Sequence, residues 1–211
     1  SVGIYGRSAA SLKRGEDNLA VNCGRLVEYD LAEQSEITAA RDRIRLTDDL
    51  SGAAQEADMI VESVVENLET KREVFASVCA LSSDDTILAS NTSGISITKI
   101  AVAVSFPERF VGTHFWNPPY LMPLIEIVRG KDTSDEIVNA IYELYEGMGK
   151  SPIICQKEAP GFIGNRLQLV LWREAFNIVQ RGIASPQDVD RAVKSSFGRR
   201  LGMVGPFELY E

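Results

Sequence analysis

The sequence is poor in the features that mark several protein classes. Its three cysteines, Cys23, Cys79 and Cys155, are odd in number and far apart in 211 residues. This pattern excludes a disulfide scaffold and matches no metal-ligand spacing, so we expect buried thiols, no metal and a reducing, cytoplasmic location. The longest stretch without a formal charge, residues 110–125, contains three prolines and therefore cannot form a membrane-spanning helix.

Basic residues are also outnumbered: 22 Lys and Arg face 30 Asp and Glu, a net charge of -8 at pH 7. They form no stripe that could follow a phosphate backbone, so nucleic acid is not an expected partner. The sequence lacks a G-x-G-x-x-G motif, the turn that holds the pyrophosphate in dinucleotide-binding folds. What remains is the composition of an ordinary globular protein, 45% hydrophobic and 25% charged, and long enough to bury a substantial core.

Short apolar runs alternate with helical segments over most of the chain. This alternation is typical of a mostly parallel sheet with helices packed on it. The predicted strands are residues 2–5, 44–47, 59–62, 86–90, 110–115, 124–128 and 152–155. The predicted helices are residues 9–29, 68–81, a short one from Ile97, and 134–148. Thr133 and Glu136 have capping-box spacing for the last helix, and Gly149 followed by Lys150 ends it.

After residue 157 the pattern changes to helices alone, and Pro160-Gly161 marks the break. One helix is predicted over residues 162–181. Ser185-Pro-Gln-Asp188 then supplies an N-cap, a proline and an acidic residue for the next helix. Two helices are too few to bury their own apolar faces, so we expect more chain after them. The predicted domains are residues 1–157 and 158–211.

Polar side chains follow two of the predicted strands, at the edge where parallel sheets bind ligands. The first group is Ser90-Asn-Thr-Ser-Gly94, which is either a ligand-binding loop or a plain turn in which Ser93 or Ser96 caps the next helix. The second begins with His114, the single histidine of the sequence. A lone histidine has either a structural or a catalytic role, and its neighbours must decide between them.

Glu126 lies inside an apolar predicted strand, where a buried carboxylate needs a charged or hydrogen-bonding partner. His114 can be that partner, because a carboxylate that fixes the tautomer of an imidazole is a recurring acid–base arrangement. A purely structural ion pair is the alternative. Asn165, in the first turn of the predicted helix 162–181, is either a further site residue or a capping amide.

The turn after the first predicted strand reads Gly6-Arg7. In NAD-binding chains this turn usually carries an acidic residue for the ribose hydroxyls, whereas an arginine suits the 2′-phosphate of NADP. A plain glycine turn with a solvent-facing arginine is the alternative. Arg7 is therefore a candidate cofactor residue, and it leaves NAD and NADP both open.

Taken in order and spacing, four segments resemble the 3-hydroxyacyl-CoA dehydrogenase family. They are Ser90-Asn-Thr-Ser-Gly94, His114-Phe-Trp-Asn-Pro118, Pro123-Leu-Ile-Glu-Ile-Val128 and Pro160-Gly-Phe-Ile-Gly-Asn-Arg166. Residues 62–71 and 202–208 also fit, so the resemblance covers nearly the whole chain. It implies a Rossmann-like α/β fold with a mostly parallel sheet and helices on both faces. The start of an all-helical C-terminal domain, which commonly forms a homodimer, would follow.

The resemblance also implies roles for individual residues. His114 matches the family's catalytic base, and Glu126 matches the acid that orients it. Ser93 matches the hydroxyl that holds the substrate oxygen, and Asn165 matches the amide that supports the same site. The positions matching cofactor contacts are Glu66, Lys71, Asn91, Ser93 and Asn117. The implied reaction interconverts a 3-hydroxyacyl substrate and its 3-oxo form with NAD, as in fatty acid metabolism.

Three departures from the family pattern matter. The first strand with its glycine loop is missing, so we expect a fragment of a longer chain, although a truncated product that cannot bind cofactor stays open. Gly6-Arg7 replaces the acidic ribose ligand. Residues 26–36 are acidic where CoA-using members carry lysines, which disfavours a phosphorylated carrier. Asn117-Pro-Pro-Tyr120 and Asn165-Arg-Leu-Gln168 also resemble the branch containing lambda-crystallin and gulonate dehydrogenase, whose substrates are small free hydroxy acids.

Two alternatives to this enzyme remain. One is a non-catalytic structural or binding protein of the lambda-crystallin type that retains the fold. The other is a dehydrogenase of the 3-hydroxyisobutyrate or 6-phosphogluconate type. It is disfavoured, because such enzymes use a catalytic lysine and the sequence shows no matching motif.

Overall fold

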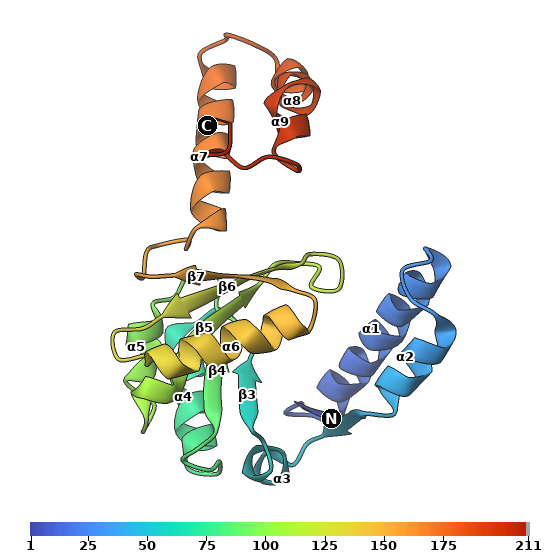
Figure 1. Cartoon of the computed structure of the whole chain (residues 1–211), viewed down its shortest axis with the longest axis vertical. Helices are drawn as coiled ribbons and strands as arrows, with labels where there is room; N and C mark the ends of the chain where they lie inside the picture. Colours follow the sequence, from blue (N-terminus) through green and yellow to red (C-terminus); the bar gives the residue numbers. More distant parts are fainter. Residues whose placement is uncertain (210–211) are drawn as a thin grey trace. The chain divides into compact units, whose positions relative to one another are not determined.

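The structure of the protein is a computed structural model that describes residues 1–209. The chain divides into two compact units, Ser1–Glu158 and Ala159–Glu211. The first unit combines strands and helices, and the described part of the second unit is helical (Figure 1). The expected change from an α/β to an all-helical segment is therefore present.

The strands of the first unit form two sheets. The larger sheet has the order β3-β4-β5-β6-β7, and β1 pairs with β2 separately. Every pairing is parallel except that of β5 with β6. The strands are β1 (Val2–Tyr5), β2 (Ile44–Thr47), β3 (Met59–Glu62), β4 (Ile87–Ser90), β5 (Phe110–Phe115), β6 (Leu124–Arg129) and β7 (Ser151–Cys155). The mostly parallel sheet is confirmed, and each predicted strand ends within one residue of its observed bounds.

The helices of this unit include the four that were predicted and two that were not. They are α1 (Ala9–Glu28), α2 (Gln34–Arg41), α3 (Leu50–Gln55), α4 (Leu68–Cys79), α5 (Ile97–Ala101) and α6 (Asp135–Gly147), with a single 3₁₀ turn at Pro107–Arg109. The unpredicted α2 and α3 bury Ile37 and Ala54, respectively. With so little buried surface, neither helix carries the apolar stripe by which sequence periodicity is recognised.

The two faces of the larger sheet are covered by different helices. Successive side chains along a strand point to opposite faces, and Ile125 and Ile127 of β6 pack in one buried cluster with Ile137, Val138 and Ile141 of α6. Figure 1 shows α6 on one face of this sheet, with α4 and α5 on the other. Glu126, between the two isoleucines, therefore points away from α6.

The start of α6 corrects one prediction. Its N-cap is Ser134, whose side chain accepts a hydrogen bond from the Ile137 amide, and not Thr133. The Thr133 hydroxyl instead donates to the Phe110 carbonyl and accepts from the Gly130 amide. At the other end of the helix, Gly149 adopts a φ of +75°, as its predicted role as the helix stop requires.

The second unit contains α7 (Gly164–Gln180), α8 (Pro186–Ser195) and the short α9 (Phe197–Arg200), which the prediction of two helices missed. Ser185 caps α8 as predicted, accepting from the Asp188 amide, and Pro186 occupies the first turn.

The expectation of three buried thiols is also corrected. Cys155 on β7 is buried, whereas Cys23 and Cys79 are partly exposed. Both of these lie on helices, α1 and α4, and not within the sheet.

Candidate active site

His114 and Glu126 are direct cross-strand neighbours in the antiparallel pair β5–β6. Cross-strand neighbours carry their side chains on the same face of the sheet, so the strand register alone brings the two together. The imidazole Nδ1 lies 2.8 Å from Glu126 Oε2. Glu126 is fully buried and His114 is 6% exposed. The structure thus joins the two residues as the sequence predicts, and their catalytic use stays a prediction.

Trp116 is a third member of this group, which the sequence reasoning missed. Its indole Nε1 donates to Glu126 Oε2 over 3.1 Å, and its ring centroid lies 6.0 Å from that of His114. A signal for it exists in the sequence. Trp116 lies two residues after His114, and the period of two along a strand places such residues on one face.

Asn91 connects the ends of three neighbouring strands. Its side-chain oxygen accepts from the Phe115 amide over 2.9 Å, at the end of β5. Its side-chain nitrogen donates to the Ser63 hydroxyl over 3.3 Å, just after β3. The amide therefore fixes the start of the 91–94 loop beside the strand that carries His114. A contact between Asn91 and the cofactor stays a prediction.

Glu66 holds the loop that contains Ser93. Its Oε1 accepts from the Thr92 hydroxyl at 2.5 Å, the Ser93 amide at 2.9 Å and the Gly94 amide at 3.1 Å. Partial burial acts to raise the pKa of Glu66, but the Thr92 hydrogen bond and the charge of Lys71 outweigh it, so this pKa lies below its usual value. The carboxylate thus stays ionised and keeps Ser93 in place.

Lys71 supports Glu66 from inside the fold. Its Nζ lies 2.9 Å from Glu62 Oε1 and 3.3 Å from Glu66 Oε2, and its side chain is 1% exposed. Glu62, equally buried, also accepts from the Ser90 hydroxyl and the Val64 amide, each over 2.6 Å. In the structure Lys71 therefore acts on the site through Glu66, while direct contact with a cofactor stays a prediction.

The remaining candidates lie at exposed or more distant positions. Asn117 is exposed and precedes a cis bond to Pro118. Arg7 is exposed after β1, in the two-stranded sheet, next to Ser8, which caps α1. Asn165 is in the first turn of α7, within the second unit. The structure therefore brings Glu66, Ser93 and His114 to the carboxyl ends of adjacent strands. Asn165 belongs to the second unit, and its part in the site stays a prediction.

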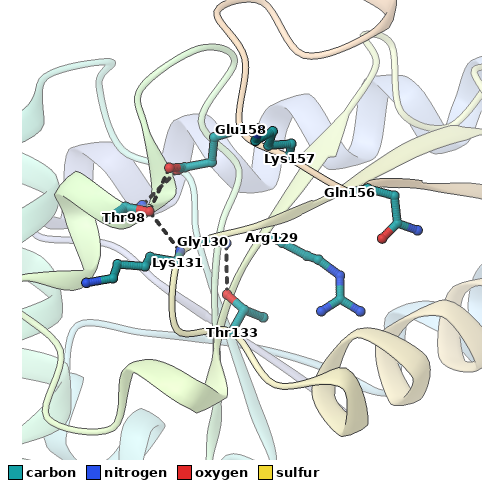
Figure 2. A pocket seen from close by; sticks show the side chains of 8 residues that line it. All are labelled: Thr98, Arg129, Gly130, Lys131, Thr133, Gln156, Lys157 and Glu158. Carbon is teal, nitrogen blue, oxygen red and sulfur yellow. Dashed lines mark hydrogen bonds between the residues drawn. The ribbon is translucent and has the colours of Figure 1, made fainter.

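A pocket of about 460 Å³ lies at the opposite end of the larger sheet. Arg129, at its wall, pairs with Val111 near the start of β5, whereas His114 is near the end of that strand. Figure 2 shows the Glu158 carboxylate pointing at Thr98. Glu158 accepts from the Thr98 amide and hydroxyl over 2.8 and 2.6 Å, and so fastens the last residue of the first unit to α5. This pocket is distinct from the His114 site.

Within residues 1–209, no three His, Cys, Asp or Glu side chains gather as a metal ion would require. Over the same range, no helix has the length and apolar character needed to cross a bilayer.

Parallel strands that end in polar loops define the first unit as an α/β domain, and it carries a buried carboxylate–imidazole pair at the carboxyl end of β5. Residues 1–159 match the NAD-binding domain of 3-hydroxyacyl-CoA dehydrogenase, and residues 161–211 match its C-terminal domain. The chain belongs to the 3-hydroxyacyl-CoA dehydrogenase family, and its Rossmann-like fold is confirmed.

Several known proteins are similar over much of the chain. A 5-formyl-3-hydroxy-2-methylpyridine 4-carboxylate 5-dehydrogenase from Mesorhizobium japonicum is 40% identical over 80% of this chain and 54% of its own length. L-carnitine dehydrogenase from Oceanobacillus iheyensis is 40% identical, covering 80% and 55%. The chain thus spans about half the length of these relatives.

One solved structure supports the same assignment over more of the chain. The (S)-3-hydroxybutyryl-CoA dehydrogenase from Ralstonia eutropha is 33% identical, with a TM-score of 0.87, over 92% of this chain and 68% of that one. Relatives of this family thus include proteins named for CoA thioesters and proteins named for small free acids.

Proposed function

We propose that the protein is an NAD-dependent oxidoreductase that interconverts a 3-hydroxyacyl substrate, or a small free hydroxy acid, and its 3-oxo form. The observation that carries the proposal is the buried pair of His114 and Glu126, 2.8 Å apart. Oxidation of a secondary alcohol needs a base for the hydroxyl proton at the moment the hydride leaves carbon. An imidazole oriented by a buried carboxylate is suited to that task.

The contact with Glu126 assigns the two ring nitrogens of His114. Because Nδ1 faces a carboxylate oxygen, we assign the proton of the neutral ring to Nδ1. Nε2 then carries the lone pair and takes the proton from the substrate hydroxyl. Glu126 stabilises the imidazolium that forms and holds the ring in this tautomer.

The exposed residues at the same sheet edge fit a nucleotide. Glu66, Ser93 and Asn117 follow β3, β4 and β5, and all three are exposed. Nucleotides bind at this edge of parallel sheets, and NAD, when bound, supplies the hydride acceptor. In the proposed site Ser93 holds the substrate oxygen, and Asn165 from the second unit supports it. Arg7 offers a guanidinium group that suits a 2′-phosphate, so NADP is the alternative cofactor.

Two substrate classes are proposed, CoA thioesters and small free acids. The acidic stretch at residues 26–36 disfavours the phosphates of CoA. The relatives named for carnitine and for a pyridine carboxylate make small free acids a second class to test. We further propose that the protein is cytoplasmic and forms a homodimer through the helical unit. Activity on CoA thioesters would assign it to fatty acid metabolism.

His114→Gln tests the catalytic role, with Thr113→Ser, which changes the adjacent β5 residue, as the control. The variant is expected to lower kcat by about a hundredfold or more, the scale for losing a positioned acid–base group. Substrates should include 3-hydroxybutyryl-CoA, free 3-hydroxybutyrate and carnitine. Unchanged kcat in His114→Gln would refute the role of His114.

Cofactor titration separates the enzyme from the non-catalytic alternative. The full-length protein is titrated with NADH and NADPH separately while nicotinamide fluorescence is followed. Binding of NADH supports the proposal, and a preference for NADPH that is lost in Arg7→Ala assigns Arg7 to the 2′-phosphate. Failure of both cofactors to bind would favour a structural protein that retains the fold.

A further inference from the structure

We infer that Trp116 is a positioning residue for the His114–Glu126 pair. Its indole N–H holds the buried Glu126 carboxylate in place beside His114, and it competes with the imidazole for the negative charge on Glu126 Oε2. The effect on turnover rests on the proposed function. The effect on the imidazole itself does not, because it concerns contacts within the protein and needs neither substrate nor cofactor.

The geometry makes the two donors share one atom. His114 Nδ1 and Trp116 Nε1 approach the same oxygen, Glu126 Oε2, at 2.8 and 3.1 Å. The carboxylate is fully buried, so bulk water does not screen it. A buried carboxylate is stable only when hydrogen bonds or opposite charge compensate it. Trp116 is thus part of what allows Glu126 to be charged beside the histidine.

The chemistry of indole makes this contact one-directional. The indole N–H is a donor only and keeps its proton over the whole working pH range. It therefore marks Oε2 as an acceptor and favours the ionised carboxylate. Phenylalanine would keep an aromatic ring at this position but supply no donor.

Removal of the Trp116 N–H strengthens the interaction between the Glu126 carboxylate and His114, because one hydrogen bond that competes for Oε2 is lost. The imidazolium form then gains stability, so the ring becomes protonated at a higher pH. Glu126, from β6, is the charged group that the ion pairs place against the ring. The neighbouring strand β4 places Ser90 opposite Gly112, and the Ser90 hydroxyl donates to the Glu62 carboxylate, which Lys71 neutralises. On α5, apolar Ile97 lies against Gly112.

NMR of the full chain without cofactor or substrate tests the proposal directly. The His114 ring resonances are identified by their loss in His114→Gln, and their titration is compared in wild type and Trp116→Phe. We expect the midpoint to rise by about one pH unit, a tenfold change in the protonation equilibrium. Trp172→Phe, at the chain's other tryptophan, is the matched control and should leave the midpoint unchanged.

A second measurement on the wild type avoids dependence on any variant's folding. Because the indole and the imidazole share Oε2, the Trp116 Nε1–H resonance should move with pH at the same midpoint as the His114 ring. The same resonance should shift in Glu126→Gln. A titration-independent indole signal, or a His114 midpoint unmoved by Trp116→Phe, would overturn the proposal.

Steady-state kinetics adds the readout on turnover. The acidic limb of the kcat profile should move upward with the NMR midpoint in Trp116→Phe. At a pH well below the midpoint, kcat should fall about tenfold with KM changed less than about twofold. A changed KM with an unmoved kcat profile would instead indicate a substrate contact and refute the positioning role. If the wild type has no dehydrogenase activity, the proposed function fails, while the NMR result still decides the coupling.

Discussion

Lys71→Met tests whether the buried ion network under the Ser93 loop is required for the fold. Methionine has a length similar to that of lysine but no charge, so it leaves the Glu62 carboxylate buried without its cation. The lysine and Glu62 side chains are each 1% exposed and 2.9 Å apart. Removal of one partner of such a pair costs about 3–5 kcal/mol, because an uncompensated charge stays inside.

The loss should be visible in thermal and urea unfolding. For a chain of this length, about 3–5 kcal/mol corresponds to a fall in Tm of about 6–20 °C. Amide hydrogen exchange should also accelerate at Ser93 and Gly94, because both amides donate to Glu66, whose carboxylate Lys71 contacts.

Two further variants identify the cause. Lys99→Met removes an exposed lysine and should change stability by less than about 0.5 kcal/mol. Glu62→Gln combined with Lys71→Met removes both buried charges and should recover about 1–3 kcal/mol. A Lys71→Met variant within about 1 kcal/mol of wild type would refute this account of the network.

Two more predictions follow from contacts of the first unit. The pKa of Glu66 is lowered below its ordinary value of 4.5, so its ionisation stabilises the fold above that pH. The stability difference between wild type and Glu66→Gln should be full at pH 7 and shrink as acid urea titrations pass below pH 4.5; a difference that does not depend on pH would contradict this. Glu158→Ala removes the acceptor of the Thr98 amide and hydroxyl and should lower the urea stability by about 1–3 kcal/mol, whereas Glu146→Ala, on the exposed side of α6, should not.

Much of the larger sheet could be predicted because its central strands β4, β5 and β6 are short apolar runs that are largely buried on both faces. Glu126 could be singled out for the same reason, since a carboxylate between two isoleucines contradicts that pattern unless it has a partner. The helices α2 and α3 were not predicted, because they are short and bury one residue each, which leaves too few apolar positions to mark a helix face.

The contacts within the site were harder to predict than its members. Glu66 matched a cofactor position, yet in the structure its Oε1 accepts from the Ser93 and Gly94 amides, a partnership set by how two loops meet. Lys71 gave no sign of burial, because lysines are almost always exposed unless paired. For Trp116, the period of two predicts the face of the strand but not which carboxylate oxygen accepts the hydrogen bond of its indole N–H.

The placement of His114 opposite Glu126 by strand register has a consequence for insertions and deletions. The connection between β5 and β6 can change in length without altering the pair, provided the same residues stay opposite each other in the ladder. A single-residue insertion within β6 before Glu126 would have the reverse effect, because the pleat would turn the carboxylate onto the α6 face, among Ile137 and Ile141. Length variation in this hairpin is therefore tolerable in the loop and disruptive in the strand.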